Sequence, residues 1–338
     1  MTVPATTNDL LGHEAAEAAL LAAVRSGRLH HGWLIAGPSG IGKATLAYRF
    51  ARFLLAGAKG EGLAVNPSNP VAKRIAAGAH ADLVVVERTQ RDNGTLRDEI
   101  VVDDVRRIEP LFRRTSAEGG WRIVIIDEAD RMNTAAQNAV LKILEEPPAN
   151  ALLLLTAEAP GRLLPTIRSR VRKLALQPLP RNHMETLLEK LLPGEDHAVL
   201  AALAEGSPGR ALALHQAEGV TIYRELLAIL NSGQPRLMLD FSEKLGRKGG
   251  EEGYAVLARL LPDWLASVAK LAATGEMSER MAGEGEAAVR LAQSLGLERS
   301  LALWDKVRGL FAQADGLNLD RKQVLLSALF AVRGAGMA

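Results

Sequence analysis

The stretch HGWLIAGPSGIGKATLAYRFARFLL, residues 31–55, constrains this chain more than any other. Residues 33–36 form a short apolar run, which predicts a buried strand. A glycine-rich turn follows over 37–42, and Lys43 begins a segment with apolar residues at helical spacing. A strand, a G-x-x-x-x-G-K loop and a helix in this order predict a phosphate-binding loop in an α/β fold.

The loop supplies the groups that bind phosphate. Its glycines let the backbone N–H groups point inward, the helix N-terminus adds partial positive charge, and Lys43 adds a full charge. The predicted nucleotide-binding positions are Gly37, Pro38, Ser39, Gly40, Ile41, Gly42, Lys43, Ala44 and Thr45.

One position departs from the pattern of an active ATPase. The pattern places Ser or Thr directly after the lysine, where the hydroxyl binds Mg²⁺. Here that residue is Ala44, and the hydroxyl comes one residue later at Thr45. Successive helical residues point about 100° apart, so we do not expect Thr45 to reach the metal.

Composition narrows the class of protein. The chain has 338 residues, 48% hydrophobic and 24% charged, which is ordinary for a globular protein of two or three domains. The net charge is only +2, so the chain is not basic enough overall to indicate nucleic-acid binding. The absence of Cys excludes disulfides and thiolate-bound metals. With no signal-like segment and no apolar run near 18 residues, we expect a soluble, cytoplasmic protein without a membrane partner.

A pair of acidic residues follows a second apolar run. Residues 122–126, RIVII, lead directly into Asp127 and Glu128. In nucleoside-triphosphate sites the first carboxylate holds magnesium and the second polarises the attacking water. A solvated acidic turn is the alternative, but the phosphate loop upstream favours the nucleotide site.

Thr156 ends the next apolar run, 152–156. Ligands on open α/β sheets bind at the carboxyl ends of strands, so we expect Thr156 to lie where it senses a γ-phosphate. A threonine that only hydrogen-bonds locally is the alternative.

Apolar runs alternate with helical patterns up to about residue 177, which predicts a doubly wound parallel sheet. The predicted strands are 33–36, 83–86, 122–126 and 152–156. The predicted helices here are 8–27, one from Lys43, 71–77 in an irregular insertion over 56–79, 105–113, and one from Thr134 as N-cap. A turn is expected at 92–94. Beyond a hinge at 177–180 we expect three short helices over 181–214, then long amphipathic helices from 220.

Several segments together resemble the AAA+ clamp-loader subunits of bacterial replicases. NAVLKILEEPP followed by a strand and LLPTIRSR is highly specific to that family. The supporting stretches are HHGWLIAGPSGIGKATLA, GAHADLVVVE, VVDDVRRI, VIIDEADRMNTAAQNAVLKILEEPP, LLPTIRSRV, GSPGRALAL and NLDRKQVLLSAL.

The resemblance implies three domains: an α/β AAA+ P-loop module over 1–177, a small helical lid over 178–219, and an all-α helical collar for oligomerisation over 220–338. It also implies residue roles. These are Walker A for loop 37–43, Walker B for Asp127 and Glu128, sensor 1 for Thr156, an arginine acting in trans for Arg170, and sensor 2 for Arg210. A surface salt bridge is the alternative for Arg170, and capping a lid helix or binding resting nucleotide is the alternative for Arg210.

Three departures from the family pattern matter. The four-cysteine zinc module is absent from 56–79, Val171 replaces the cysteine after Arg170, and Ala44 replaces the Walker A hydroxyl. The last departure favours the stator subunit of the family, which commonly does not hydrolyse ATP, over its gamma/tau motor subunits.

The resemblance therefore implies a stator in a hetero-pentamer with delta and gamma/tau subunits, acting in ATP-driven loading of the sliding clamp onto primed DNA. Its implied cofactors are ATP and Mg²⁺, with no zinc, and the chain alone is expected to be a weak or inactive ATPase. An active motor ATPase and a small-molecule P-loop kinase are the alternatives.

Overall fold

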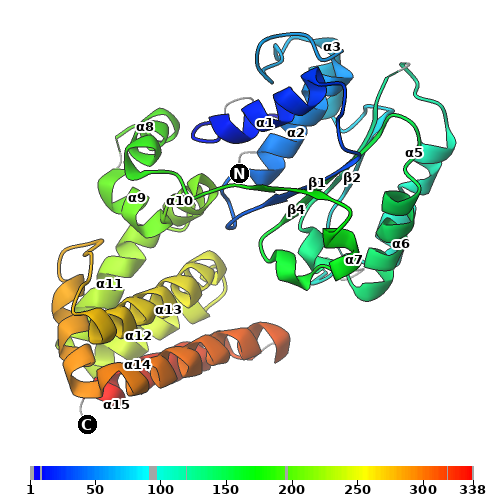
Figure 1. Cartoon of the computed structure of the whole chain (residues 1–338). Coiled ribbons are helices and arrows are strands. Elements are labelled where there is room, and N and C mark those ends of the chain that lie inside the picture. The colour runs from blue at the N-terminus through cyan, green and yellow to red at the C-terminus, as the bar shows by residue number, and fades with distance from the viewer. Residues whose placement is uncertain are drawn as a thin grey trace. The chain divides into compact units, whose positions relative to one another are not determined.

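The computed structural model describes residues 4–7, 10–90, 97–118, 120–194, 197–317 and 319–336 (Figure 1). Contacts divide the chain into two compact units. The first is Met1–Leu187 with Gly206–Gly209, and the second is Leu188–Glu205 with Arg210–Ala338. The predicted domain limits at 177 and 219 stay predictions.

The first unit is built on a five-stranded sheet in which every strand pair is parallel. Its order is β2 (Leu83–Val86), β3 (Arg122–Ile126), β4 (Ala151–Ala157), β1 (Gly32–Ala36), β5 (Arg172–Ala175). The four predicted strands are confirmed to within one residue, and so is the parallel α/β fold class.

Side chains alternate between the two faces of the sheet, and helices cover both faces (Figure 1). Trp33 and Ile35 pack with α1 (Glu14–Arg25) and α2 (Lys43–Leu55) in one core. Leu34 packs in the other core with α4 (Val102–Arg106), α5 (Glu109–Arg113), α6 (Thr134–Glu145) and α7 (Pro165–Arg168). Burial on both faces explains why the central strands are continuous apolar runs.

The structure corrects several local predictions. Strand β5, of sequence RKLA, was not predicted; it forms a sheet edge with Arg172 and Lys173 exposed. The helix expected over 105–113 is two short helices, α4 and α5. The N-cap of α6 is Asn133, whose side chain accepts a hydrogen bond from the Ala136 N–H, and not Thr134.

Other elements of the first unit agree with the sequence more closely. Helix α3 (Pro70–Ala76) confirms the short helix in the insertion and begins with Asn69 as N-cap and proline at its first position. Two 3-10 turns, η1 (Ala129–Arg131) and η2 (Pro160–Arg162), follow β3 and β4. Helix α1 is shorter than the predicted 8–27. The turn expected at 92–94, like residues 8 and 9, lies outside the described residues.

The described residues after 180 contain helices and no strand, as predicted. The three short helices are α8 (Arg181–Leu191), α9 (His197–Ala204) and α10 (Pro208–Gln216). The longer ones are α11 (Gly219–Ser232), α12 (Pro235–Gly246), α13 (Glu251–Thr274), α14 (Glu284–Leu317) and α15 (Arg321–Gly336). Helix α14 is kinked at Gly296, where φ is 65°.

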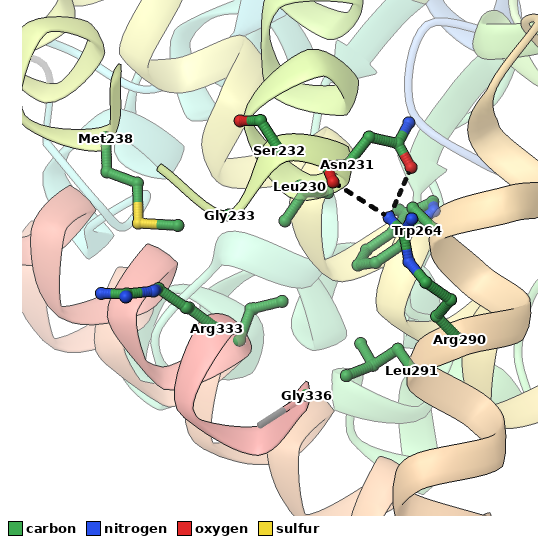
Figure 2. A pocket seen from close by; sticks show the side chains of 12 residues that line it. Leu230, Asn231, Ser232, Gly233, Met238, Trp264, Arg290, Leu291, Arg333 and Gly336 are labelled. Atoms are coloured by element: carbon green, nitrogen blue, oxygen red, sulfur yellow. Dashed lines mark hydrogen bonds between the residues drawn. The ribbon is translucent and has the colours of Figure 1, made fainter. Parts of the chain in front are cut away.

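A cavity of about 330 Å³ lies among helices α11 to α15 of the second unit. Figure 2 shows Arg290 on one side of it, where the guanidinium donates to the side-chain oxygen of Asn231 at 2.7 Å. Arg333 lies on the opposite side in this view. The buried Trp264 and Met238 contribute apolar walls. No helix of the described residues has the length and apolar composition needed to cross a membrane.

Candidate nucleotide-binding site

The sheet brings the predicted site residues of the first unit to one edge. In the register of the strands, Ile35 of β1 pairs with Thr156 of β4, and Ile126 of β3 pairs with Leu155. The loop after β1 and Asp127 after β3 therefore flank the carboxyl end of β4. Parallel strands place their carboxyl ends at the same edge, which is why this grouping was foreseeable from the sequence.

The loop over residues 37–42 leads from β1 into α2. Gly40 and Gly42 have φ of 71° and 105°, a conformation that glycine adopts without strain. The backbone N–H groups of residues 39–45 form no hydrogen bond to any residue that the structure describes. Open N–H groups in a tight turn ahead of a helix N-terminus make an anion-binding concavity.

Lys43 lies within this loop. Its amine donates to the carbonyl oxygens of Gly37 and Pro38, at 2.9 and 2.8 Å. Burial lowers the pKa of Lys43 below its ordinary value, while the carboxylates of Glu158 and Asp127 act in the opposite direction. A bound phosphate would favour the charged amine for the same reason as these carboxylates.

The acidic pair and Thr156 form one connected group. The fully buried Thr156 hydroxyl donates to Asp127 Oδ1 at 2.5 Å and accepts from the Glu128 N–H at 2.9 Å. Its partners are 28 and 29 residues away in sequence, so its hydrogen bonds are not local. Thr156 thus positions both carboxylate-bearing residues.

Arg88 is a member of the site that sequence reasoning missed. Its Nε donates to Glu128 Oε2 at 2.6 Å, and Glu128 itself has a left-handed backbone with φ of 54°. Arg88 comes two residues after β2, at the same edge of the sheet as Asp127. Its position just after a predicted strand was the sequence signal that could have included it in the site. Arg88 and Glu128 both line a hollow of about 600 Å³. Its other lining residues are Val85, Glu87, Thr89, Gln90, Arg107 and Asp127.

Ala44 and Thr45 are half-buried in the first turn of α2. The side chain of Ala44 has no oxygen to offer a metal. The oxygen ligands at this edge of the sheet include the carboxylates of Asp127 and Glu128, which suit Mg²⁺ chemically. The donor set therefore fits phosphate fully and magnesium incompletely.

Arg170 lies just beyond α7. Its guanidinium donates to the Thr166 carbonyl at 3.2 Å and pairs with Glu145 at 3.1 Å. Its side chain is 39% exposed, and Glu145 is 45% exposed. Such an exposed pair contributes at most about 1 kcal/mol and is easily exchanged for another anion. Within the described residues, Arg170 forms no hydrogen bond or ion pair with loop 37–42 or the acidic pair.

Arg210 belongs to the second unit. Its side chain is 6% exposed and donates to Glu205 at 2.8 Å and, through its other terminal nitrogen, to Asp263 of α13. Two carboxylates of its own unit therefore engage the guanidinium. The sensor 2 role stays a prediction.

Comparison with known proteins decides the family. The family model described as "DNA polymerase III, delta subunit" matches residues 12–180, which is half of the chain. The chain belongs to this family. The resemblance predicted from the motifs is thereby confirmed.

Individual relatives agree with this assignment. The DNA polymerase III subunit delta prime of Pseudomonas aeruginosa is 38% identical over 218 residues, covering 62% of this chain and 61% of the relative. The delta prime subunit of Escherichia coli is 35% identical over 201 residues, covering 59% and 58%. The gamma/tau subunit of Mycobacterium tuberculosis is 32% identical over 194 residues, covering 57% and 32%. The chain thus spans about three fifths of the length of its delta prime relatives.

A solved structure of a DNA polymerase III gamma subunit-related protein from Thermotoga maritima is 16% identical, with a TM-score of 0.43. It covers 94% of this chain and 99% of that chain.

Proposed function

We propose that this chain is a clamp-loader subunit of a bacterial replicative DNA polymerase III, of the delta prime type. The observation that carries the proposal is the phosphate loop next to Asp127 and Thr156, in which the N–H groups of residues 39–45 bond to no described residue and the Lys43 amine lies within the loop. A nucleoside triphosphate such as ATP fits this set of donors. The delta prime and gamma/tau relatives support the assignment to the loader.

We further propose that the chain binds nucleotide but hydrolyses it slowly or not at all. Mg²⁺, when bound, would screen the phosphate oxygens and be held through Asp127, without a hydroxyl from Ala44. Glu128 is engaged by Arg88, so its carboxylate is less available to accept a proton from water. The gamma/tau relative makes an active motor the second candidate.

Arg170 is the group that we propose acts in a neighbouring subunit's site. Its weak surface pair with Glu145 leaves the guanidinium able to turn to a phosphate of a partner, a gamma/tau subunit of a hetero-pentamer that also contains delta. A guanidinium donates two parallel hydrogen bonds to a phosphoryl group and keeps its charge. The work of that assembly would be to load the sliding clamp onto primed DNA.

The test is a loader reconstituted with its natural partner subunits and carrying Arg170→Ala or Arg170→Lys in this chain. Since an arginine supplied in trans is worth about 10³–10⁵ in rate, we expect DNA-stimulated ATP turnover at the affected site to be lost in both, with assembly intact. Lysine keeps the charge but loses the two parallel donors, so Arg170→Lys should not restore the ATP turnover that Arg170→Ala loses.

The matched control is Arg168→Ala, which removes an exposed arginine two residues away. A loader that carries Arg168→Ala should assemble and hydrolyse ATP as the wild-type loader does. Normal clamp loading and turnover in both assembled Arg170 variants would contradict the proposal for this residue and leave only a scaffold role.

A further inference from the structure

The carbonyl oxygens of the phosphate loop are all hydrogen-bonded, although the N–H groups of residues 39–45 bond to no residue that the structure describes. Each of the six residues from 37 to 42 has its carbonyl oxygen bonded to a donor of the first unit, at distances of 2.8 to 2.9 Å. The donors, in order along the loop, are the Lys43 amine twice, the Ser207 hydroxyl, the Gly209 N–H, His13 Nε2 and the Leu46 N–H.

Three of these donors come from outside the strand–loop–helix segment. Ser207 Oγ donates to the Ser39 carbonyl, 168 residues away, and the Gly209 N–H donates to the Gly40 carbonyl, both at 2.8 Å. His13, which precedes α1, donates from Nε2 to the Ile41 carbonyl, also at 2.8 Å. Ser207 and His13 are 3% and 5% exposed, so water does not compete freely for these bonds.

Segment Gly206–Gly209 also lies in close contact with the loop backbone. A Cβ added to Gly209 would be 2.8 Å from Gly40 Cα and 2.9 Å from the Gly40 carbonyl oxygen. The backbone of Gly209 does not lie in the left-handed region, so its need for glycine is one of space. A side chain at position 209 would therefore have to displace the Gly40 backbone.

The two observations have a common geometric cause. In each planar peptide unit the C=O and the N–H point in opposite directions, so fixing the carbonyls on one side aims the N–H groups at the other. We propose that Ser207, Gly209 and His13 are positioning residues of the phosphate site, and that Gly206–Gly209 is a clamp that holds loop 37–42 ready for the phosphates of a nucleotide. This rests on the proposed nucleotide binding.

A loop that is held in its binding conformation loses less conformational entropy when the phosphate arrives. The clamp residues therefore set nucleotide affinity without touching the nucleotide. Nothing in the local sequence of 31–55 carries this information, because the clamp comes from the start of α10.

The experiment measures the Kd of ADP, with a fluorescent ADP analogue as probe, for the full chain and its variants. Because one neutral hydrogen bond is at stake, Ser207→Ala is expected to raise Kd about fivefold to tenfold. Gly209→Ala, which displaces the loop, should raise it by at least as much. His13→Leu should weaken binding as Ser207→Ala does, whereas His13→Gln, which keeps a side-chain donor, should restore most of the affinity.

The control is Gly62→Ala, because a Cβ there meets nothing within 4 Å. Thermal unfolding of each ligand-free variant shows whether the chain is folded. If folded Ser207→Ala, Gly209→Ala and His13→Leu bind ADP as the wild type does, the positioning role is wrong, even where their stability falls.

A second measurement separates this proposal from the proposed function. Amide NMR shifts of residues 39–45 in the ligand-free chain should move in Ser207→Ala and Gly209→Ala and stay in place in Gly62→Ala. Unmoved shifts would overturn the clamp. If the wild type fails to bind ADP or ATP while these shifts move as expected, the nucleotide-binding function is what fails.

Discussion

Ala44 is the residue on which the chemistry of this chain depends most directly. The loop around it has the donors that phosphate needs, and the acidic pair lies at the same sheet edge. Position 44, where a magnesium site of the usual kind has a hydroxyl, is an alanine here. If nucleotide binds here as proposed, binding and hydrolysis are separable, because phosphate affinity would depend on the loop and hydrolysis on the metal and the base.

Restoring that oxygen gives a prediction at this scale. Ala44→Ser is expected to tighten ATP binding about tenfold in the presence of Mg²⁺, because a metal ligand is gained, and to leave the Kd in EDTA unchanged. Titrations with and without Mg²⁺ check this. If Thr45→Ala instead abolishes a magnesium dependence that the wild type already shows, Thr45 supplies the ligand and the reasoning from helix geometry is wrong.

Among the elements, the helices of the second unit are connected by a buried polar group. Glu284, at the start of α14 and fully buried, accepts from the Tyr223 hydroxyl of α11 at 2.5 Å and from Arg280 Nε at 2.8 Å. Burial raises the pKa of Tyr223 above its ordinary value although Arg280 opposes this, so the hydroxyl stays a donor. Arg280 and Arg210 both approach Glu205, which extends the group to α10.

Removing one partner should destabilise the fold strongly. Glu284→Ala leaves the Arg280 charge buried without its main partner, so we expect about 3–5 kcal/mol less free energy of unfolding. Denaturant titration followed by circular dichroism measures it. Glu286→Ala, two residues along the same helix with a side chain 72% exposed, removes only a surface pair and should cost less than about 1 kcal/mol. Equal losses in the two variants would refute this account.

The strands and helix ends differ in how well the sequence predicts them. Strands β1, β3 and β4 were predictable because they are buried on both faces, and burial demands the apolar runs that the sequence shows. Strand β2 lies at a sheet edge and is only partly buried, but its sequence LVVV is apolar throughout and predicted the strand as well. Strand β5 lies at the sheet edge, where charged residues are tolerated and discourage further pairing, so RKLA carried no strand signal. The N-cap of α6 was misplaced by one residue because Asn133 and Thr134 are both favourable caps.

For the molecule as a whole, the absence of Cys leads to a prediction about metal. The described residues contain no group of three or more His, Asp or Glu side chains placed to hold a metal ion. We expect elemental analysis to find zinc far below one ion per chain, and EDTA to leave the Tm unchanged, because no thiolate is available. Zinc near one ion per chain would contradict this.

Local sequence determined the parts of the candidate site that follow strands. The phosphate loop, Asp127, Glu128 and Thr156 each end or follow an apolar run, and parallel strands bring such positions to one edge. The tertiary structure alone decided which groups surround them. Arg88 meets Glu128 across 40 residues, and Ser207 meets the loop across 168. No periodicity or motif records such contacts, because they arise only when folding closes the long loops of chain between them.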